Sequence, residues 1–356
     1  MITLMIMILG GCSKPEEEAE VLLPGSGKTV GLAMPTQNSQ RWIDDCENMK
    51  VRLEELGYVV LDQFAENDVN RQISQVDKFI EQKVDCLVIA SVDSYALTNV
   101  LKKAKDADIP VIAYDRLIMD TDAISYYATF DNKGVGTIIA NEIVSQAKLE
   151  EVKEAGESRT IEFFMGSPDD NNAIMFYNGL MEVLKPYLED GTLVCKSGKI
   201  TFNETAIVRW SEDAAAEKCA KLLATHYKNE DLDICASVFD GFAYGCKTAL
   251  ENAGYTEENW PIITGQDADL KACKNIVAGK QTSSVYKDTR VLAEKCVTMV
   301  NAVCNGSDPE INDIEQYNNR VITVPAYLCT PIVINADNIK EIIVDGGYYT
   351  EEQLMD

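Results

Sequence analysis

Two distant segments of the chain repeat one order of patterns. Each has an apolar run, an acidic loop, a helical stretch and a second apolar run that ends at an acidic residue. Strands that alternate with helices in this way predict parallel sheets with helices on both faces. The chain is therefore predicted to be an α/β protein with two doubly wound lobes. The strand, helix and strand are 84–90, 96–107 and 111–114 in the first segment, and 234–238, about 243–253 and 261–264 in the second.

The ends of these strands carry the side chains of a candidate site. Asp115 and Arg116 follow one strand, and Asp240 and Asp267 follow two others. Ligands of open parallel sheets bind at the carboxyl ends of the strands, so two facing lobes would form a cleft lined by Asp and Arg. Carboxylate and amide oxygens accept hydrogen bonds from hydroxyl groups, and Arg and Lys donate them. A sugar would suit such a cleft, because its hydroxyl groups can bond these polar side chains and its C–H surface can pack against aromatic rings.

Composition argues against several classes of function. The formal net charge is −26, whereas nucleic acids are bound by basic patches, so no nucleic acid partner is expected. The eleven cysteines include no CxxC pair and His226 is the single histidine, so neither a metal site nor a cofactor is expected. Cysteines inside apolar runs, such as Cys86 and Cys235, are interpreted as small core residues, and disulfide pairing stays open. After the N-terminus, no segment is long and apolar enough to cross a membrane.

The first 27 residues have the pattern of an export signal followed by a tether. Residues 1–11 are apolar and too short to span a bilayer as a stable helix. The run LGGC at 9–12 is similar to a bacterial lipobox, in which the cysteine is lipidated and becomes the mature N-terminus. Residues 12–27 are rich in Pro, Glu, Gly and Ser, which predicts a flexible linker. We therefore expect a signal peptide at 1–11, lipidation at Cys12, and an extracytoplasmic domain that only the lipid anchors to a membrane.

Gly27-Lys28-Thr29 resembles the end of a phosphate-binding loop and raises a nucleotide-binding alternative. The full motif needs a glycine at position 22, where the chain has Leu22. It also needs a strand before the loop and a helix after it, because the helix N-terminus helps to hold the phosphate. Here the apolar run 30–34 follows the lysine instead. We interpret the segment as the end of a linker that enters the first strand.

Several longer stretches match one protein family. They include YATFDN (127–132), GSPDDNNA (166–173), VDGGYY (344–349) and GQDADLKACKNIVAGKQTSSVYKDTR (265–290). The matching stretches cover nearly everything after residue 28, in order and with compatible spacing. By these stretches the chain resembles the type I periplasmic sugar-binding proteins of ABC importers. It is most similar to the multiple-monosaccharide-binding and xylose-binding receptors.

This resemblance implies a fold, a function and partners. The fold is two parallel-sheet lobes joined by a three-strand hinge near Asp131, Lys287 and Thr330. The protein would be a monomeric receptor, not an enzyme, that binds an aldose such as glucose, galactose, arabinose or xylose and delivers it to ABC permease subunits. Binding would close the lobes about the hinge. The N-terminal lobe would consist of 28–131 and 288–329, and the C-terminal lobe of 132–287 and 330–356.

The resemblance also implies a set of ligand-binding residues at strand ends, on loops and at the hinge. Trp42 and Trp210 would stack on the two faces of the sugar, although Trp42 also fits the apolar stripe of a helix predicted over 39–56. Phe239-Asp240 stands where xylose receptors have Asn-Asp, so the pentose-specific pattern is not fully kept. The predicted residues are Arg41, Trp42, Asp115, Arg116, Asp170, Asn171, Asn172, Arg209, Trp210, Asp240, Asp267 and Lys287.

The alternatives to an importer receptor are a glycosidase, a transcription regulator and a sugar sensor. Glycosidases use two carboxylates across a cleft, and Asp115 and Asp267 fit that arrangement. A glycosidase needs one acid with a raised pKa, whereas each acid here is predicted to have a donor partner such as Arg116. A transcription regulator of this fold would carry N-terminal DNA-binding helices, which residues 1–28 cannot form. A sugar sensor coupled to a chemoreceptor or sensor kinase fits the sequence equally and differs only in its partner.

Overall fold

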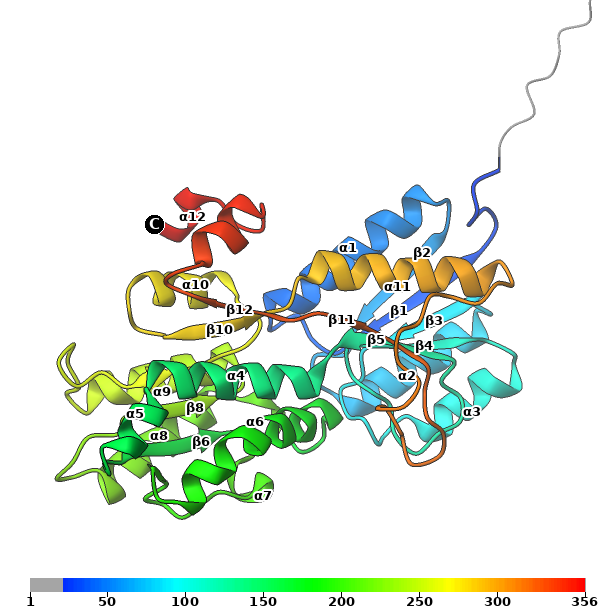
Figure 1. Cartoon of the computed structure of the whole chain (residues 1–356). Helices are drawn as coiled ribbons and strands as arrows, with labels where there is room; N and C mark the ends of the chain where they lie inside the picture. The colour runs from blue at the N-terminus through cyan, green and yellow to red at the C-terminus, as the bar shows by residue number, and fades with distance from the viewer. Residues whose placement is uncertain (1–21, 356) are drawn as a thin grey trace, which may run out of the picture.

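The structure of the protein is a computed structural model that describes residues 22–355. Two lobes lie side by side, and each is built on a parallel sheet with helices around it (Figure 1). The α/β class with two doubly wound lobes is therefore confirmed. The predicted signal peptide and Cys12, with most of the predicted linker, lie outside the described residues. Within 22–355, every helix is too short or too polar to span a membrane.

The first lobe has a six-stranded sheet in the order β11-β5-β4-β3-β1-β2, and all its strand pairs are parallel. Its strands are β1 (Thr29–Met34), β2 (Val59–Phe64), β3 (Cys86–Ile89), β4 (Val111–Tyr114), β5 (Tyr126–Phe130) and β11 (Ala326–Cys329). Its helices are α1 (Gln40–Glu55), α2 (Val69–Glu81), α3 (Thr98–Asp106) and α11 (Thr289–Cys304).

Helices cover both faces of this sheet. Alternate strand residues point to opposite faces, so both sets of side chains are buried. In β1, Val30 and Leu32 belong to the apolar cluster that contains α1 and α11 side chains, whereas Ala33 belongs to the cluster that contains α2 and α3 side chains. The near-continuous apolar strands of the sequence follow from this double coverage. The helix predicted over 39–56 is α1, and Trp42 on its buried face is 5% exposed.

The second lobe repeats the strand plan of the first. Its four-stranded parallel sheet has the order β7-β6-β8-β9, and the antiparallel pair β10-β12 continues it, since the N–H of Val285 donates to the Gly265 carbonyl over 3.0 Å. The strands are β6 (Arg159–Phe164), β7 (Leu193–Val194), β8 (Ile234–Ser237), β9 (Ile262–Ile263), β10 (Ser283–Tyr286) and β12 (Ile332–Asn335). In each lobe the second strand along the chain lies at one edge, outside the first, which is a doubly wound order.

The helices of the second lobe also cover both faces of its sheet. Side chains of α4 and α6 form one apolar cluster with the strands, and those of α8 and α9 form another. These helices and the remaining short elements are α4 (Asn132–Gln146), α5 (Leu149–Glu154), α6 (Asn171–Glu189), α7 (Phe202–Thr205), η1 (Val208–Trp210), α8 (Glu212–His226), α9 (Asp240–Asn252), α10 (Leu270–Val277), η2 (Lys340–Asp345) and α12 (Glu351–Met355).

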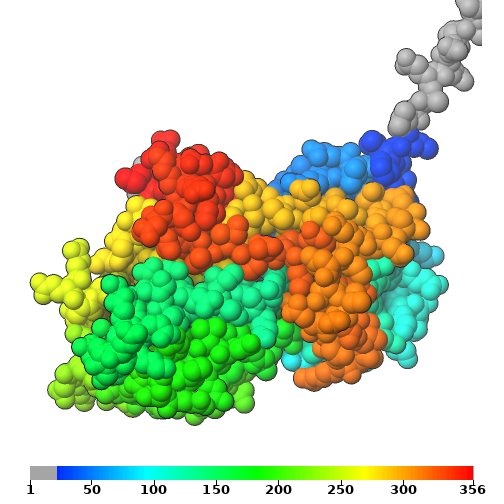
Figure 2. Space-filling model, viewed as in Figure 1, coloured from blue at the N-terminus to red at the C-terminus, as the bar shows by residue number. Residues whose placement is uncertain are grey.

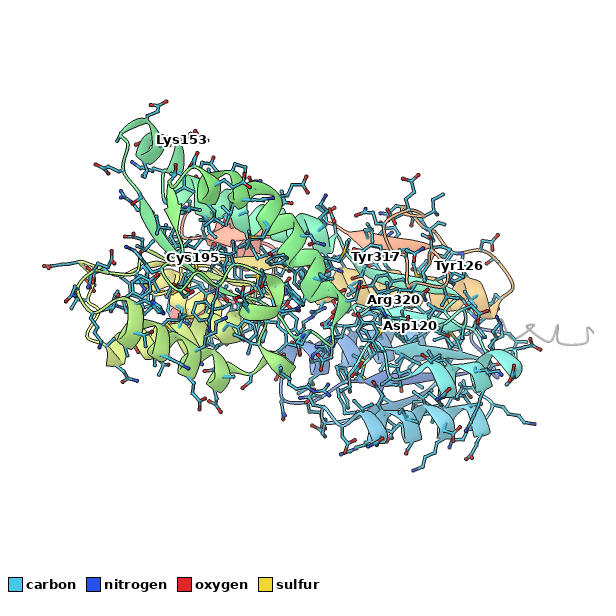
Figure 3. All side chains as sticks on the ribbon, turned by 90° about the horizontal axis from the view of Figure 1, so that it is seen from below. Asp120, Tyr126, Lys153, Cys195, Tyr317 and Arg320 are labelled. Atoms are coloured by element: carbon cyan, nitrogen blue, oxygen red, sulfur yellow. The ribbon has the colours of Figure 1, made fainter. Side chains whose placement is uncertain are left out.

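The chain crosses between the lobes three times, from β5 to α4, from β10 to α11 and from β11 to β12. The C-terminal segments, orange to red, run over the junction of the lobes on the face shown in Figure 2. The Tyr317 hydroxyl donates to the Phe130 carbonyl over 3.2 Å and accepts from the Asn132 N–H over 3.3 Å, so it holds the first crossing. Figure 3 shows Arg320 beside Asp120, with which it forms an ion pair of 3.3 Å.

Two sequence features outside the sheets have structural explanations. The Lys28 ammonium donates to Asn305 Oδ1 over 2.5 Å, and β1 begins directly after it. The segment that resembles a phosphate loop is therefore the entry to the first strand, as interpreted from the sequence. Ten cysteines from Cys46 to Cys329 are free thiols, and eight of them are buried. Three of these lie on α8, β8 and α9 with sulfur atoms within 4.8 Å of one another, a grouping that sequence spacing did not indicate: Cys219, Cys235 and Cys246.

Candidate ligand-binding site

A cavity of about 400 Å³ lies between the lobes. Residues that follow β1, β3 and β4 line it from the first lobe, and residues that follow β6, β8 and β9 line it from the second. Doubly wound sheets bind ligands at this end, where neighbouring strands send their connections to opposite faces. Ten of the twelve predicted residues line the cavity, namely Arg41, Trp42, Asp115, Arg116, Asp170, Asn172, Arg209, Trp210, Asp267 and Lys287.

The structure does not bring Asp240 and Asn171 to the cavity lining. Asp240 is fully buried as the first residue of α9, and its Oδ1 accepts hydrogen bonds from Gln281 Nε2 and Ser284 Oγ, both over 2.8 Å. It therefore supports the wall behind the cavity. Asn171 begins α6, and its backbone N–H points to Ser94 of the first lobe.

A network of buried charges connects the two lobes at the cavity. Arg41 of α1 pairs with Asp115 through Nη2, with Asp267 at 3.5 Å through Nη1, and with Asp45 at 3.3 Å through Nε. Lys287, which is 2% exposed, places its ammonium 3.0 Å from Asp267 and 3.9 Å from Asp115. Two cations thus lie between carboxylates of opposite lobes, with little water to screen them.

These neighbours keep Asp115 ionised. Burial alone would raise the pKa of its carboxyl group, but the charges of Arg41 and Lys287, with the hydrogen bond from Arg41, hold that pKa below its usual value. A carboxylate in this state accepts hydrogen bonds and donates none. Asp115 therefore offers the cavity a fixed acceptor.

Five of the lining residues have positive φ angles, and four of them belong to the predicted site, the fifth being Asn67 with a φ of 59°. In these four the φ angles are 58° at Asp115, 58° at Arg209, 54° at Trp210 and 96° at Asp267. Such conformations cost about 1–3 kcal/mol each for residues with a Cβ, and they concentrate at functional sites. The fold offsets this strain at Asp115, whose carbonyl oxygen accepts hydrogen bonds from Tyr127, Thr129 and Asn172 side chains over 2.5–2.9 Å.

Aromatic rings form the second-lobe wall of the cavity. Trp210, Phe239 and Phe176 line it, and the Trp210 ring has edge contacts with the other two at centroid distances of 5.6 and 6.3 Å. Gly166 makes this possible, because a Cβ there would overlap the Trp210 ring. An aromatic face of this kind packs against apolar C–H surface of a ligand.

Trp42 has a different environment from Trp210. The guanidinium carbons of Arg41 and Arg116 lie 4.8 and 5.1 Å from its ring centroid. Cation–π contacts of this length orient both arginines. The predicted stacking of Trp42 on a sugar stays a prediction, and the contacts seen here give the ring a role in holding the two guanidinium groups.

Sequence reasoning missed part of the lining. Asp169 stands next to Asp170 in the matched stretch 166–173, and Tyr348 and Tyr349 lie in the matched stretch 344–349, so a signal for these three was present. The other lining residues were not predicted to bind a ligand, although Gln266 and Asp269 also lie in a matched stretch, 265–290. These other residues lie in loops after strands or in the first two turns of helices. They are Thr36, Asn38, Ser39, Gln40, Asp44, Asn67, Val92, Phe176, Glu212, Phe239, Gly241, Tyr244, Gln266 and Asp269.

The expectation that no acid of the cleft has a raised pKa is wrong for Asp170. Burial raises the pKa of this carboxyl group, and the nearby charge of Arg116 only partly opposes the change. Asp170 nevertheless has structural partners, because it pairs with Arg116 at 3.0 Å and accepts from the Asn172 N–H over 2.9 Å at the start of α6. Its position therefore has an explanation in the fold, independent of acid catalysis.

Asp45 lies behind Arg41, fully buried and outside the cavity lining. Burial raises the pKa of Asp45 from 3.8 to about 7, although the charge of Arg41 and the hydrogen bond from Tyr114 oppose the change. Below about pH 4 the carboxyl group is protonated in both the folded and the unfolded chain. Between that pH and about pH 7 the unfolded chain releases the proton first, so the stability contribution of Asp45 is lost as the pH rises.

We therefore expect Asp45→Asn to become more stable relative to wild type as the pH rises from 5 to 8. A pKa change of this size corresponds to about 4 kcal/mol at most. Thermal unfolding of both proteins at each pH measures the difference, because groups common to both cancel. A difference in Tm that stays constant over this range would contradict the proposed titration of Asp45.

Comparison with known proteins agrees with this architecture. Residues 30–308 match the family described as periplasmic binding protein domain, and the chain belongs to that family. Within it, the chain is 44% identical over 328 residues to a multiple sugar-binding periplasmic receptor, ChvE, of Rhizobium radiobacter, covering 92% of each chain. It is 34% identical to the D-xylose-binding periplasmic protein of Escherichia coli, over 91% of this chain and 92% of that one.

A solved structure shows the same fold in a similar protein. An ABC transporter solute-binding protein from Clostridium phytofermentans with bound β-D-glucose is 45% identical to this chain. It superimposes with a TM-score of 0.87, over 92% of this chain and all of that one. The periplasmic binding protein type I fold predicted from the sequence is thus confirmed.

Proposed function

We propose that this chain is a receptor that binds one monosaccharide between its lobes and delivers it to an ABC importer. The observation that carries the proposal is the charged network at the cavity. Asp115 and Asp267 come from opposite lobes and share Arg41 and Lys287, so a ligand that contacts the acids would bridge the lobes. The sugar-binding names of the relatives and the glucose in the similar structure support the same ligand class.

The two walls of the cavity match two kinds of sugar surface. On one side, carboxylates accept from ring hydroxyls while Arg41, Arg116 and Lys287 donate to them. On the other, Trp210 and Phe239 pack against the C–H face. Apolar Phe239 cannot bond a hydroxyl group, and this supports a broad aldose receptor that accepts hexoses over one restricted to xylose.

Isothermal titration calorimetry tests the proposal. We expect a form that begins at residue 22 to bind glucose and to respond to galactose, arabinose or xylose, while chromatography recovers the sugar unchanged. The same form should release no heat with ATP, since the Lys28 ammonium is held by Asn305. No binding of any aldose, or conversion of the sugar, would refute a receptor function.

The finer parts of the function are also proposals. We propose that Cys12 is lipidated and holds the receptor at the outer face of a membrane, where it meets the permease. The names of two relatives describe them as periplasmic, which supports an extracytoplasmic location for this protein. Cys12→Ala should then move the protein from the membrane fraction to the soluble fraction of a bacterial host, and continued membrane retention would reject the anchor.

We further propose that the lobes divide at the three crossings of the chain. The first lobe would then comprise 28–131 with 288–329, and the second 132–287 with 330–356. Strand membership supports this division, because β11 pairs with β5 of the first sheet and β12 pairs with β10 of the second.

A further inference from the structure

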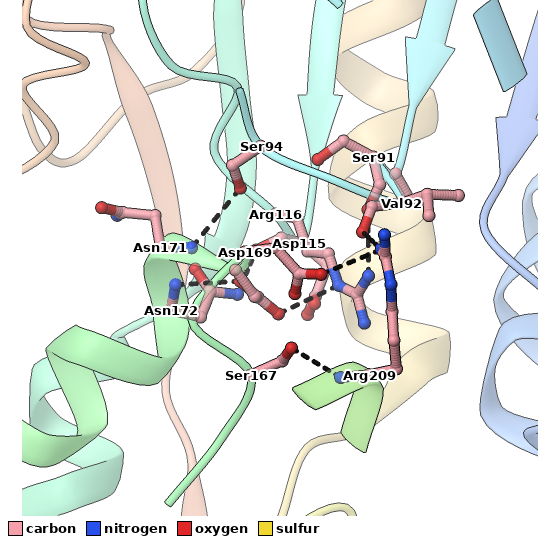
Figure 4. Close-up of polar contacts among 12 residues, drawn as sticks. Ser91, Val92, Ser94, Asp115, Arg116, Ser167, Asp169, Asn171, Asn172 and Arg209 are labelled. Atoms are coloured by element: carbon pink, nitrogen blue, oxygen red, sulfur yellow. Dashed lines mark hydrogen bonds and ion pairs between the residues drawn. The ribbon is translucent and has the colours of Figure 1, made fainter. Parts of the chain in front are cut away.

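One side of the cavity is closed by direct contacts between the lobes (Figure 4). The first lobe contributes the loop after β3, residues 91–94. The second contributes residues 167–172, which are the turn before α6 and the first two residues of that helix. The backbone N–H of Ser94 donates to the carbonyl oxygen of Asp169 over 2.9 Å. The backbone N–H of Asn171 lies 3.4 Å from Ser94 Oγ, which accepts its hydrogen bond.

Arginines extend this set of contacts on both sides. Arg209 donates to the Val92 carbonyl of the first lobe over 3.2 Å, while Asp169 of its own lobe pairs with it at 2.9 Å. Arg116 of the first lobe pairs with Asp170 of the second at 3.0 Å. The Arg209–Val92 and Arg116–Asp170 contacts join the two lobes. The Asp169–Arg209 pair lies within the second lobe and orients Arg209 toward the first.

Ser94, unlike Val92, Asp169 and Arg209, does not line the cavity. It is fully buried, and its carbonyl oxygen accepts from the Met119 N–H of its own lobe over 2.8 Å. Its hydroxyl group faces the first turn of α6, where N–H groups lack partners within the helix. The Ser94 contacts to the second lobe therefore require the closed arrangement but do not require a ligand.

We propose that Ser94, with residues 91–94 and 167–172, forms an interlobe latch that sets how far the sugar-free receptor is closed. A latch of this kind stabilises the closed state by the same amount whichever sugar is bound. Where only the closed state binds fully, the apparent Kd equals the intrinsic Kd divided by the closed fraction. Ser94 is thus a positioning residue for the proposed sugar site: it changes affinity without changing selectivity.

The effect on affinity rests on the proposed function, but the effect on closure does not. Small-angle X-ray scattering of the sugar-free protein measures closure directly. Ser94→Phe places a large ring where the lobes meet, so its radius of gyration should exceed that of wild type. The control is Ser74→Phe, the same change on the exposed side of α2 in the same lobe, which should scatter like wild type. Equal radii for Ser94→Phe and wild type would overturn the latch, whether or not a sugar binds.

Titration with glucose and xylose then tests selectivity. We expect Ser94→Phe to weaken both sugars by the same factor, on the order of tenfold or more. Ser94→Ala removes one hydrogen bond without adding bulk, so we expect a loss of about two- to tenfold for both sugars. If Ser94→Phe does not fold, the Ser94→Ala result decides. Unchanged affinity in Ser94→Ala, or a changed ratio of the two affinities in either variant, would contradict the proposal.

Discussion

Replacing Asp267 by asparagine is expected to weaken sugar binding by roughly ten- to a hundredfold. The carboxylate lies 3.0 Å from the Lys287 ammonium and 3.5 Å from Arg41 Nη1, and it lines the cavity. Hydrogen bonds to charged groups contribute about 1.5–3 kcal/mol each, and about 1.4 kcal/mol is a factor of ten in Kd. Asparagine keeps the size of the side chain but removes its negative charge and one acceptor oxygen. The loss of affinity therefore measures the contribution of that charge and that oxygen.

The matched control is Lys28→Ala, which removes a charge on the outer surface of the first lobe. Its ammonium contacts Asn305 and Pro24, and it does not line the cavity. We expect the Kd of this variant to equal that of wild type by calorimetry. Wild-type affinity in Asp267→Asn would show that the interlobe acids do not bind the ligand, and the proposed site would then be wrong.

Arg41→Met is expected to lower the free energy of unfolding by about 3–5 kcal/mol, which is the usual cost of breaking a buried ion pair from one side. Arg41 pairs with three carboxylates, and its side chain is 9% exposed. Without the guanidinium group, Asp45 keeps only the hydrogen bond from Tyr114, and Asp115 keeps Lys287 as its nearest cation. Methionine fills a similar volume, so the measured loss is electrostatic.

Arg52→Met is the control on the same helix. Arg52 pairs with Glu294 at 3.0 Å, but the two side chains are 37% and 63% exposed, and such surface pairs contribute at most about 1 kcal/mol. Urea unfolding of both variants at one pH gives the comparison. Equal losses for Arg41→Met and Arg52→Met would mean that water screens the buried network.

The sequence predicted the alternation of strands and helices in each segment because apolar runs and helical spacing are local signals. It also placed Asp115 and Asp267 correctly at the cavity, since both follow strands. It could not distinguish Asp240 from these two residues, because Asp240 also follows a strand. The difference lies in the turn: Asp267 has a φ of 96°, whereas Asp240 is already the first residue of α9 and points into the core.

Other parts of the site depend on contacts that a local pattern does not contain. Tyr348 and Tyr349 lie in a matched stretch, but no apolar or helical pattern predicts that they reach the cavity from the far end of the chain, after its third crossing. Ser94 meets Asn171 across the junction of the lobes, so neither its loop nor the start of α6 reveals the contact by itself. Asp45 lies one helical turn after Arg41, and its burial, which the sequence alone did not indicate, produces its raised pKa.

The three crossings also determine when each lobe can be completed during synthesis. The apolar face of the first sheet that α1 covers also needs Leu292 and Val300 of α11, and β5 gains its outer neighbour only with β11. The ribosome makes both elements after β6 to β10 of the other lobe. A nascent chain that ends before residue 289 therefore has part of this apolar face uncovered. A lobe expressed as one continuous segment of the chain would have the same defect. Each lobe takes its last strand, β11 or β12, from a part of the chain that comes after strands of the other lobe.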